Sequence, residues 1–270
     1  MRLWFGILFV ALGLAAQDVR IQVLGTTDMH GQVMAEDTFS LQPANQGWAK
    51  IATLIRAQQA ANPNTVLVDC GDTIQGQPAN YIRNVLRRDL PEPSIAIMNA
   101  LGYSAMAVGN HEYNFGLDVL REAEKQAHFP FLSANTLDAQ GKPAFPDARV
   151  VTVAGVRVLL VGFTTPIVPK IEEPENYAGL RFKDILQTAA TLIPRLKAET
   201  RADVVVALLH CGLGAVDGQP GDENAALRLA DQVPGLDAIF TGHTHLAIST
   251  THKGVPILQA QSQGRALARV

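Results

Sequence analysis

The sequence contains only two cysteines, Cys70 and Cys211, in its 270 residues. So small a number excludes a fold that depends on a framework of disulfides. Each cysteine lies in a short motif that follows an apolar stretch, where a small and largely buried residue is expected. We therefore expect two free buried thiols. The alternative is that the two cysteines pair in an exported protein.

An excess of charge of one sign is also lacking, since 22 Lys and Arg stand against 25 Asp and Glu. This balance excludes the basic surface with which proteins bind nucleic acids or anionic membranes. We expect no nucleic-acid partner. Any phosphate group that the protein binds must be bound at a local site, not by a basic surface. Apolar residues make up 47% of the chain, which is enough for one sizeable core.

Long hydrophobic runs are absent except at the N-terminus. The run at 3–14 is shorter than the ~20 residues that span a bilayer. Arg2 precedes it, and Ala15 and Ala16 offer small residues for cleavage. We predict that 1–16 is a signal peptide, and that the protein is exported to the periplasm or beyond. An uncleaved N-terminal anchor is the alternative, although we expect no stable membrane anchor.

From residue 17 to residue 270 the sequence alternates short apolar strands with helical segments, which is typical of an α/β domain. Strands are expected at 19–24, 65–69, 104–108, 131–134, 149–153, 156–161, 203–209, 236–241, 247–250 and 256–259. Helices are expected at 48–61, 79–88, 93–101, 116–126, 184–200 and 223–231. The pair Ala154-Gly155 predicts a tight hairpin turn, so the sheets are not purely parallel. The last residues look like the start of another strand, which suggests a truncated sequence.

Five short segments place potential metal ligands directly after an expected strand. They are 27–31 (TDMHG), 68–72 (VDCGD), 108–112 (VGNHE), 208–212 (LLHCG) and 241–245 (TGHTH). Side chains at the carboxyl ends of strands in an open α/β sheet meet at one edge. Segments that lie far apart in the sequence can therefore converge on one site. Each segment also contains a glycine, which lets the backbone turn sharply.

These segments supply nitrogen and oxygen ligands without any need for thiolate. The candidate ligands are Asp28, His30, Asp72, Asn110, His210, His243 and His245. Such a set suits divalent zinc, manganese, iron or magnesium. Seven ligands exceed the three or four usual for one ion, so two ions that share a carboxylate fit better. Any one segment alone could be an ordinary polar turn, and we interpret His128 and His252, which lack this context, as surface or turn residues.

The five segments resemble the motifs of the calcineurin-like metallophosphoesterase superfamily. The longer stretches 68–76 and 109–116 are similar to the catalytic domain of secreted 5′-nucleotidases and 2′,3′-cyclic-nucleotide 2′-phosphodiesterase/3′-nucleotidases. The resemblance implies a four-layer α/β/β/α sandwich at 17–270 and hydrolysis of phosphoesters. It also implies that one ion is bound by Asp28, His30 and His245, the other by Asn110, His210 and His243, with Asp72 between them.

His111 follows a candidate ligand and is predicted to face the substrate. Two cations lower the pKa of a water between them. A protonated His111 would then stabilise the transition state or protonate the leaving oxygen; the alternative is a purely structural hydrogen bond. Many 5′-nucleotidases have an aspartate three residues later, whereas this chain has Asn114. An amide orients an imidazole without raising its pKa as a carboxylate does. Asparagine here is similar to the cyclic-nucleotide branch of the family.

We therefore predict an exported, monomeric hydrolase that acts on small phosphoesters, above all on cyclic nucleotides and 3′-nucleotides. Two alternative functions use the same metal site. In one, the substrates are 5′-nucleotides, sugar nucleotides or thiosulfate-derived groups; in the other, the protein is a module that binds metal or phosphate without catalysis. In the family a C-terminal domain supplies the aromatic stack for the base, and we identify no such domain in these 270 residues. Thr27, Asp69, Glu112, Thr241 and Thr244 lie beside the candidate ligands and are candidates for orienting them; the alternative is that each is a local turn or cap residue.

Overall fold

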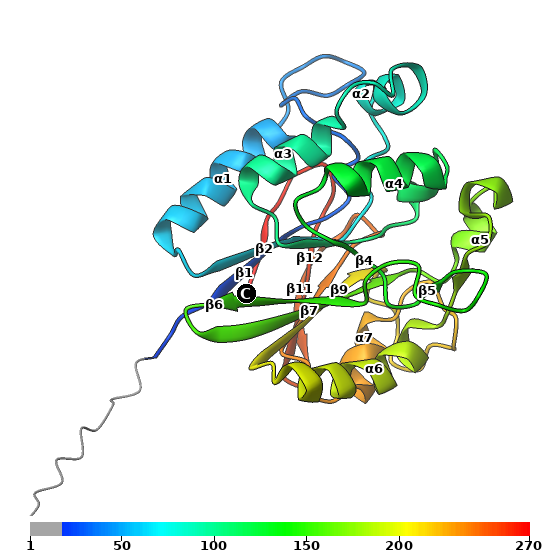
Figure 1. Ribbon diagram of the computed structural model, residues 1–270. Coiled ribbons are helices and arrows are strands. Elements are labelled where there is room, and N and C mark those ends of the chain that lie inside the picture. Colours follow the sequence, from blue (N-terminus) through cyan, green and yellow to red (C-terminus); the bar gives the residue numbers. More distant parts are fainter. Residues whose placement is uncertain (1–17) are drawn as a thin grey trace, which may run out of the picture.

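The computed structural model describes residues 18–270, so the predicted signal peptide at 1–16 lies outside the described residues. Two β-sheets lie face to face, and helices cover the outer face of each (Figure 1). The chain thus forms four layers in the order α/β/β/α. This arrangement confirms the predicted mixed α/β class.

The first sheet is parallel except at one edge. Its strands, in spatial order, are β13 (Ala268–Arg269), β1 (Gln22–Thr26), β2 (Thr65–Asp69), β3 (Ala105–Ala107) and β4 (Phe131–Leu132). Only β13 runs antiparallel to its neighbour. Three helices cover the outer face: α1 (Trp48–Ala61), α3 (Pro93–Leu101) and α4 (Leu117–Gln126). The outer core between them is built around Ile55, Met98 and Leu120.

The second sheet has antiparallel strands at both edges. Its strands, in spatial order, are β11 (Ala247–His252), β12 (Val255–Ala260), β10 (Ala238–Thr241), β9 (Val204–His210), β7 (Val156–Thr164) and β6 (Ala148–Val153). The predicted hairpin turn joins β6 to β7, with Ala154 and Gly155 both at positive φ. The outer face is covered by α6 (Ile185–Thr200) and α7 (Ala226–Gln232). Asp184 caps α6 by accepting a hydrogen bond from the amide of Gln187 at 2.8 Å.

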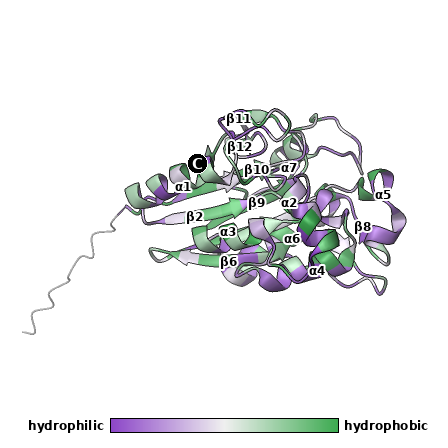
Figure 2. Cartoon of the chain, turned by 90° about the horizontal axis from the view of Figure 1, so that it is seen from above, coloured by the Kyte–Doolittle hydropathy of each residue, from purple (hydrophilic) through white to green (hydrophobic). Residues whose placement is uncertain are grey.

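A third apolar core lies between the two sheets. Val68 and Leu132 from the first sheet pack there with Leu160 and Val206 from the second. The central strands β2 and β9 are accordingly hydrophobic along most of their length (Figure 2). Gly25 on β1 is needed for this close packing, because a Cβ there would lie 2.3 Å from the ring of Phe240 on β10.

Several elements differ from the sequence prediction. The strand expected at 19–24 begins at Gln22 instead, because its partner β2 begins at Thr65 and these two residues are paired. The helix expected at 79–88 is two short pieces, α2 (Pro78–Tyr81) and the π-helix η1 (Ile82–Leu86). The amide of Arg87 donates to the carbonyl of Ile82, five residues earlier, which gives this wider turn.

The segments that connect the main strands and helices contain short elements that the sequence did not predict. They are the helices α5 (Val168–Ile171), η2 (His111–Tyr113) and η3 (Pro174–Tyr177), and the paired strands β5 (Thr136–Leu137) and β8 (Arg181–Phe182). Within residues 18–270, the structure contains no helix whose length and apolar character would suit a membrane crossing.

Candidate metal centre

The seven predicted ligands meet at the carboxyl ends of the central strands. Asp28 and His30 follow β1, Asp72 follows β2, and Asn110 follows β3. From the second sheet, His210 ends β9, while His243 and His245 follow β10. The side chains form two groups whose ligand atoms lie within 4.8 Å of one another. One group contains Asp28, His30 and His245, and the other contains Asp72, His210 and His243. Each group therefore combines ligands from both sheets.

His30 presents a lone pair to the first group. Its Nδ1 lies 3.1 Å from the backbone carbonyl of Gln75, which can only accept, so Nδ1 carries the hydrogen. In the neutral ring, Nε2 is then a free acceptor, and it lies 3.1 Å from Nε2 of His245. Two imidazole nitrogens at this distance need a proton or a cation between them.

His210 makes the same arrangement in the second group. Its Nδ1 lies 2.6 Å from the carbonyl of Cys70, while Nε2 lies 2.9 Å from Oδ1 of Asn110 and 3.2 Å from Oδ2 of Asp72. Burial alone lowers the pKa of His210, but attraction to Asp72 and a hydrogen bond with it raise the pKa to about 10. Burial opposes ionisation of Asp72, yet the His210 charge holds its pKa below the usual range. A proton or a cation must therefore lie between Nε2 of His210 and these oxygens, while Nδ1 of both His30 and His210 faces a backbone carbonyl; this is the chemistry of a divalent metal site.

The ligand loops have an unusual backbone. Five of the seven ligand residues have positive φ: Asp28 (51°), His30 (45°), Asp72 (59°), His243 (72°) and His245 (56°). Only a few per cent of residues other than glycine adopt this conformation. Such strain persists only where the surrounding structure enforces it, and it concentrates at functional sites.

Glu112 is the main enforcing group. Its buried carboxylate accepts hydrogen bonds from the amides of Asp72 at 2.7 Å and Gly109 at 2.7 Å, and so it joins two ligand loops. Gly109 must be glycine here, because a Cβ would lie 2.3 Å from Oδ1 of Asp72. The expected orienting role of Glu112 is therefore exerted through the backbone of the ligand loops.

The other four expected orienting residues divide into two pairs. Thr27 donates to Oδ2 of Asp28 at 2.6 Å, and Asp69 accepts from the amide of Gly71 at 2.8 Å. Thr241 and Thr244 instead make their side-chain hydrogen bonds to the β12 strand, where both approach Oε1 of Gln259.

His111 stands beside the two groups and is held on both sides. Its amide donates to Oδ1 of Asp72 at 2.8 Å, and its ring lies 5.3 Å from that of His30. Nδ1 of His111 lies 2.6 Å from Oδ1 of Asn114. The Nδ2 group of Asn114 donates to the carboxylate of Glu172. Because a carboxylate only accepts, the amide oxygen must face His111, so Nδ1 of His111 carries a hydrogen and Nε2 is left available.

Three residues near the centre were missed by the sequence analysis. Glu172 orients Asn114, Glu223 contacts Nε2 of His243, and Gln75 accepts from His30. All three lie on loops; Gln75 falls within the stretch 68–76 that carries the family resemblance, but no spacing or motif marks Glu172 or Glu223. Outside the centre, His128 is exposed and His252 pairs with Asp231 at 3.2 Å, which fits their interpretation as surface residues.

Cys70 and Cys211 are both free and buried, as predicted. Cys70 lies against the centre through its backbone carbonyl, which accepts from His210. Burial raises the pKa of the Cys70 thiol, and it raises the pKa of Cys211 to about 12. Neither thiol belongs to the two groups of candidate ligands.

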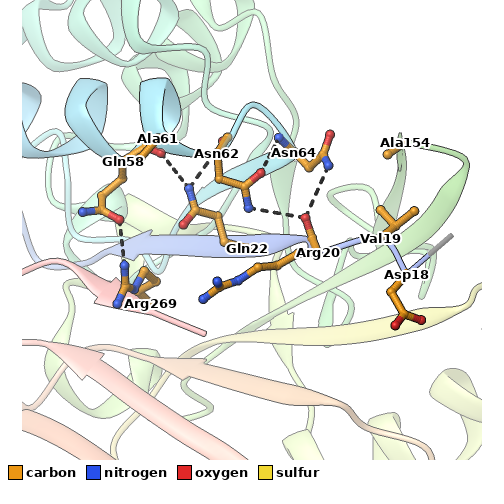
Figure 3. Close-up of a pocket in the computed structure, with 10 residues that line it drawn as sticks. All are labelled: Asp18, Val19, Arg20, Gln22, Gln58, Ala61, Asn62, Asn64, Ala154 and Arg269. Atoms are coloured by element: carbon orange, nitrogen blue, oxygen red, sulfur yellow. Dashed lines mark hydrogen bonds between the residues drawn. The ribbon is translucent and has the colours of Figure 1, made fainter.

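Two hollows lie at opposite ends of β1. A hollow of about 470 Å³ adjoins the metal centre, and Gln75 and Gln263 are among its lining residues. Another, of about 560 Å³, is lined by Gln22 and Asn62 at the opposite strand ends, where Arg269 donates to Gln58 (Figure 3). The second hollow is remote from the ligand groups, so the first is the one relevant to chemistry.

Comparison with known proteins agrees with this geometry. Residues 21–247 match the calcineurin-like phosphoesterase family. The chain belongs to this family. Calcineurin-like phosphoesterases use a dinuclear metal site, and the two ligand groups of this phosphoesterase are suited to one. The family is one of phosphoester hydrolases, and this chain is a calcineurin-like phosphoesterase domain by its sequence and fold.

Named relatives of this phosphoesterase include nucleotidases. It is 34% identical to the trifunctional nucleotide phosphoesterase protein YfkN of Bacillus subtilis, over 94% of this chain and 19% of that protein. It is 34% identical to a 2′,3′-cyclic-nucleotide 2′-phosphodiesterase/3′-nucleotidase of Haemophilus influenzae, over 87% of this chain and 37% of that protein. The crystal structure of calcineurin-like phosphoesterase YfkN superposes with a TM-score of 0.87 at 34% identity, covering 92% of this chain and 83% of that one. The chain thus spans well under half the length of these two curated relatives.

Proposed function

We propose that the seven ligands hold two divalent ions and that this phosphoesterase hydrolyses nucleotide phosphoesters, with 2′,3′-cyclic and 3′-phosphates as preferred substrates. The observation that carries the proposal is the pair of ligand groups with Asp72 between them. Oδ2 of Asp72 lies 3.2 Å from Nε2 of His210 and 4.0 Å from Nε2 of His30. Asp72 therefore faces both groups, as a bridging carboxylate must.

The ligands divide in the way the geometry suggests. Asp28, His30 and His245 would hold one ion, and His210 and His243 the other. Asn110 joins the second set, since its Oδ1 lies 2.9 Å from Nε2 of His210. The donors are all nitrogen and oxygen, so zinc, manganese, iron and magnesium are the candidate metals.

The bound ions would polarise phosphoryl oxygens and lower the pKa of an attacking water. The remaining work falls to His111. With Nδ1 held as a donor to Asn114, its Nε2 is positioned to donate to the leaving oxygen or to a phosphoryl oxygen when the ring is protonated. Asn114 fixes the ring without adding a negative charge beside it.

The preference for cyclic and 3′-phosphates rests on Asn114 and on the names of the relatives. A 5′-nucleotidase of Vibrio cholerae is also 32% identical over 85% of this chain, so 5′-nucleotides are the second candidate substrate. The apolar segment before residue 17 supports export, and a monomer is the expected form in solution.

A substrate panel with metal analysis tests the proposal. Wild type should contain two ions per chain and hydrolyse 2′,3′-cyclic AMP, 3′-AMP and bis-p-nitrophenyl phosphate faster than 5′-AMP. Asp72→Ala should lose both metal and activity, whereas Asp217→Ala, on an exposed turn, should retain both. Activity that survives a chelator would refute the metal-dependent reaction, and a preference for 5′-AMP would refute the substrate assignment.

A further inference from the structure

The hollow beside the metal centre has an aromatic wall. Its lining includes Phe39, Tyr81 and Phe115, and its volume of about 470 Å³ is in the range of small-molecule sites. Phe39 is 97% exposed and Tyr81 is 52% exposed. Among residues 18–270 these are the two exposed Phe, Tyr or Trp side chains, and both line this one hollow. Exposed apolar side chains that gather in one place mark a binding site, whereas scattered ones do not.

The same hollow is continuous with the candidate ligands. Gln75 contributes to its wall and places Oε1 3.3 Å from Nδ1 of His30. Gln263 also lines the hollow, and its backbone amide donates to the carbonyl of Asp28 at 2.7 Å. Phe115 follows Asn114 directly. A molecule that fills the hollow would therefore reach the ligand group formed by Asp28 and His30.

The chemistry of the lining selects an uncharged, flat group. Every lining residue is uncharged: Thr38, Phe39, Gln75, Gly76, Gln77, Pro78, Tyr81, Phe115 and Gln263. The phosphate therefore has no cation to meet here and belongs at the metal centre. The aromatic rings offer faces for stacking, and the glutamine amides offer donors and acceptors to the edge of a heterocycle.

We propose that this hollow is the subsite for the purine or pyrimidine base of the substrate, stacked on Phe39 and Tyr81. The proposal rests on the proposed nucleotide phosphoesterase function and adds to it a base-recognition site within this domain. Base recognition then comes from the loop that carries Phe39 and from the segment 75–81, whose Gln75 contacts His30.

A pair of substrates that differ only in the base tests the subsite. We expect kcat/KM for 3′-AMP to fall about tenfold or more in Phe39→Ala and in Tyr81→Ala, because each substitution removes a ring on which the base stacks. For ribose 3-phosphate, kcat/KM should be unchanged. Leu86→Ala is the control, because Leu86 is 62% exposed nearby but lies outside the hollow. Equal losses with both substrates, or no loss with 3′-AMP, would overturn the proposal.

Adenosine binding separates the subsite from the reaction. Adenosine carries no phosphate, so its binding to the full chain can be followed by saturation-transfer NMR without turnover. We expect binding to wild type and to Leu86→Ala, and loss of binding in the Phe39→Ala/Tyr81→Ala double variant. If nucleotides are not hydrolysed but this binding pattern holds, the subsite stands and the proposed reaction fails. If wild type hydrolyses nucleotides but does not bind adenosine, the subsite is wrong and another partner covers the two rings.

Discussion

The side-chain amide of Asn114 donates to the carboxylate of Glu172, which lies 58 residues later in the chain. Because of this bond, the amide cannot flip, and its oxygen stays 2.6 Å from Nδ1 of His111. Asn176 braces the same carboxylate through a hydrogen bond of 2.9 Å. Neutral Asn114 thus positions the ring of the catalytic candidate His111, and the carboxylate of Glu172 fixes the orientation of the Asn114 amide.

We predict that Glu172→Ala lowers kcat about tenfold with little change in KM. Hydrogen bonds to charged groups contribute about 1.5–3 kcal/mol, and without this one the Asn114 amide can turn its donor toward His111. Glu172→Gln keeps an acceptor and should lie between wild type and Glu172→Ala. Nitrogen-15 NMR of His111 should show the Nδ1–H tautomer in wild type and a mixture in Glu172→Ala. Glu175→Ala, an exposed neighbour, is the control. An unchanged tautomer would disprove the positioning role.

For the bridging carboxylate, we predict that Asp72→Asn retains the fold and loses metal. The amide oxygen can still accept from the backbone of His111, but it lacks the negative charge that two cations share. Metal content should fall from two ions to one or fewer per chain, and kcat should fall at least about 100-fold. Mass spectrometry of the native protein and metal analysis measure both. Two ions retained in this variant would contradict the bridging assignment.

Chelation should lower the melting temperature. When the free concentration of an ion is 100 times its Kd, binding stabilises the folded state by about 2.7 kcal/mol. For a domain of this size, this corresponds to a rise in melting temperature of about 5–10 °C. Calorimetry with and without chelator, followed by zinc or manganese replenishment, measures the shift. The Asp72→Ala variant provides the comparison, because its melting temperature should respond much less to the chelator.

Glu92 gives a pH dependence that is independent of the metal centre. Burial raises the pKa of Glu92 to about 7, although hydrogen bonds from the Ile95 amide and from Asn80 act to lower it. The folded state therefore binds the proton more tightly than the unfolded state. The stabilisation that protonated Glu92 gives the folded state is complete below pH ~4.5 and is lost as pH rises through about 7. The free energy of unfolding falls by up to roughly 3 kcal/mol over this range.

We predict that Glu92→Gln makes the free energy of unfolding less dependent on pH between 4.5 and 7 than in wild type. Denaturant titrations at several pH values measure this difference. The amide also weakens the cap of α3, so the variant should be less stable at pH 5. Glu199→Gln, on the exposed face of α6, should follow the wild-type curve. Parallel curves for wild type and Glu92→Gln would show that Glu92 does not titrate in this range.

Much of the site could be predicted from sequence because its ligands follow strands. A buried strand such as Thr65–Asp69 is marked by its composition, and the ends of parallel strands must meet at one edge. The candidate ligands Asp72, Asn110 and His210 were predicted in this way, and their side chains lie together in the structure. Glu172 and Glu223 could not be found, because they reach the centre from irregular loops whose path depends on tertiary packing. The π-helix after Tyr81 was missed for a similar reason: buried Arg83 and Asn84 bond to Leu90 and Ile74, which overrides the helical pattern.

Each ligand group takes side chains from both sheets, so the core between the sheets acts as a spacer that sets the distance across the centre. Changes of a few tenths of an ångström in the thickness of that layer matter for catalytic geometry. A change of volume at Leu132 or Val206 should therefore alter the reaction rate as well as stability, and it should be tolerated best with a compensating change opposite. Changes in the two outer cores should act mainly on stability, except at residues that flank the ligands, such as Met29 and Cys211. Adapting this phosphoesterase to a larger or smaller metal would accordingly begin in the middle of the sandwich, with the ligands left unchanged.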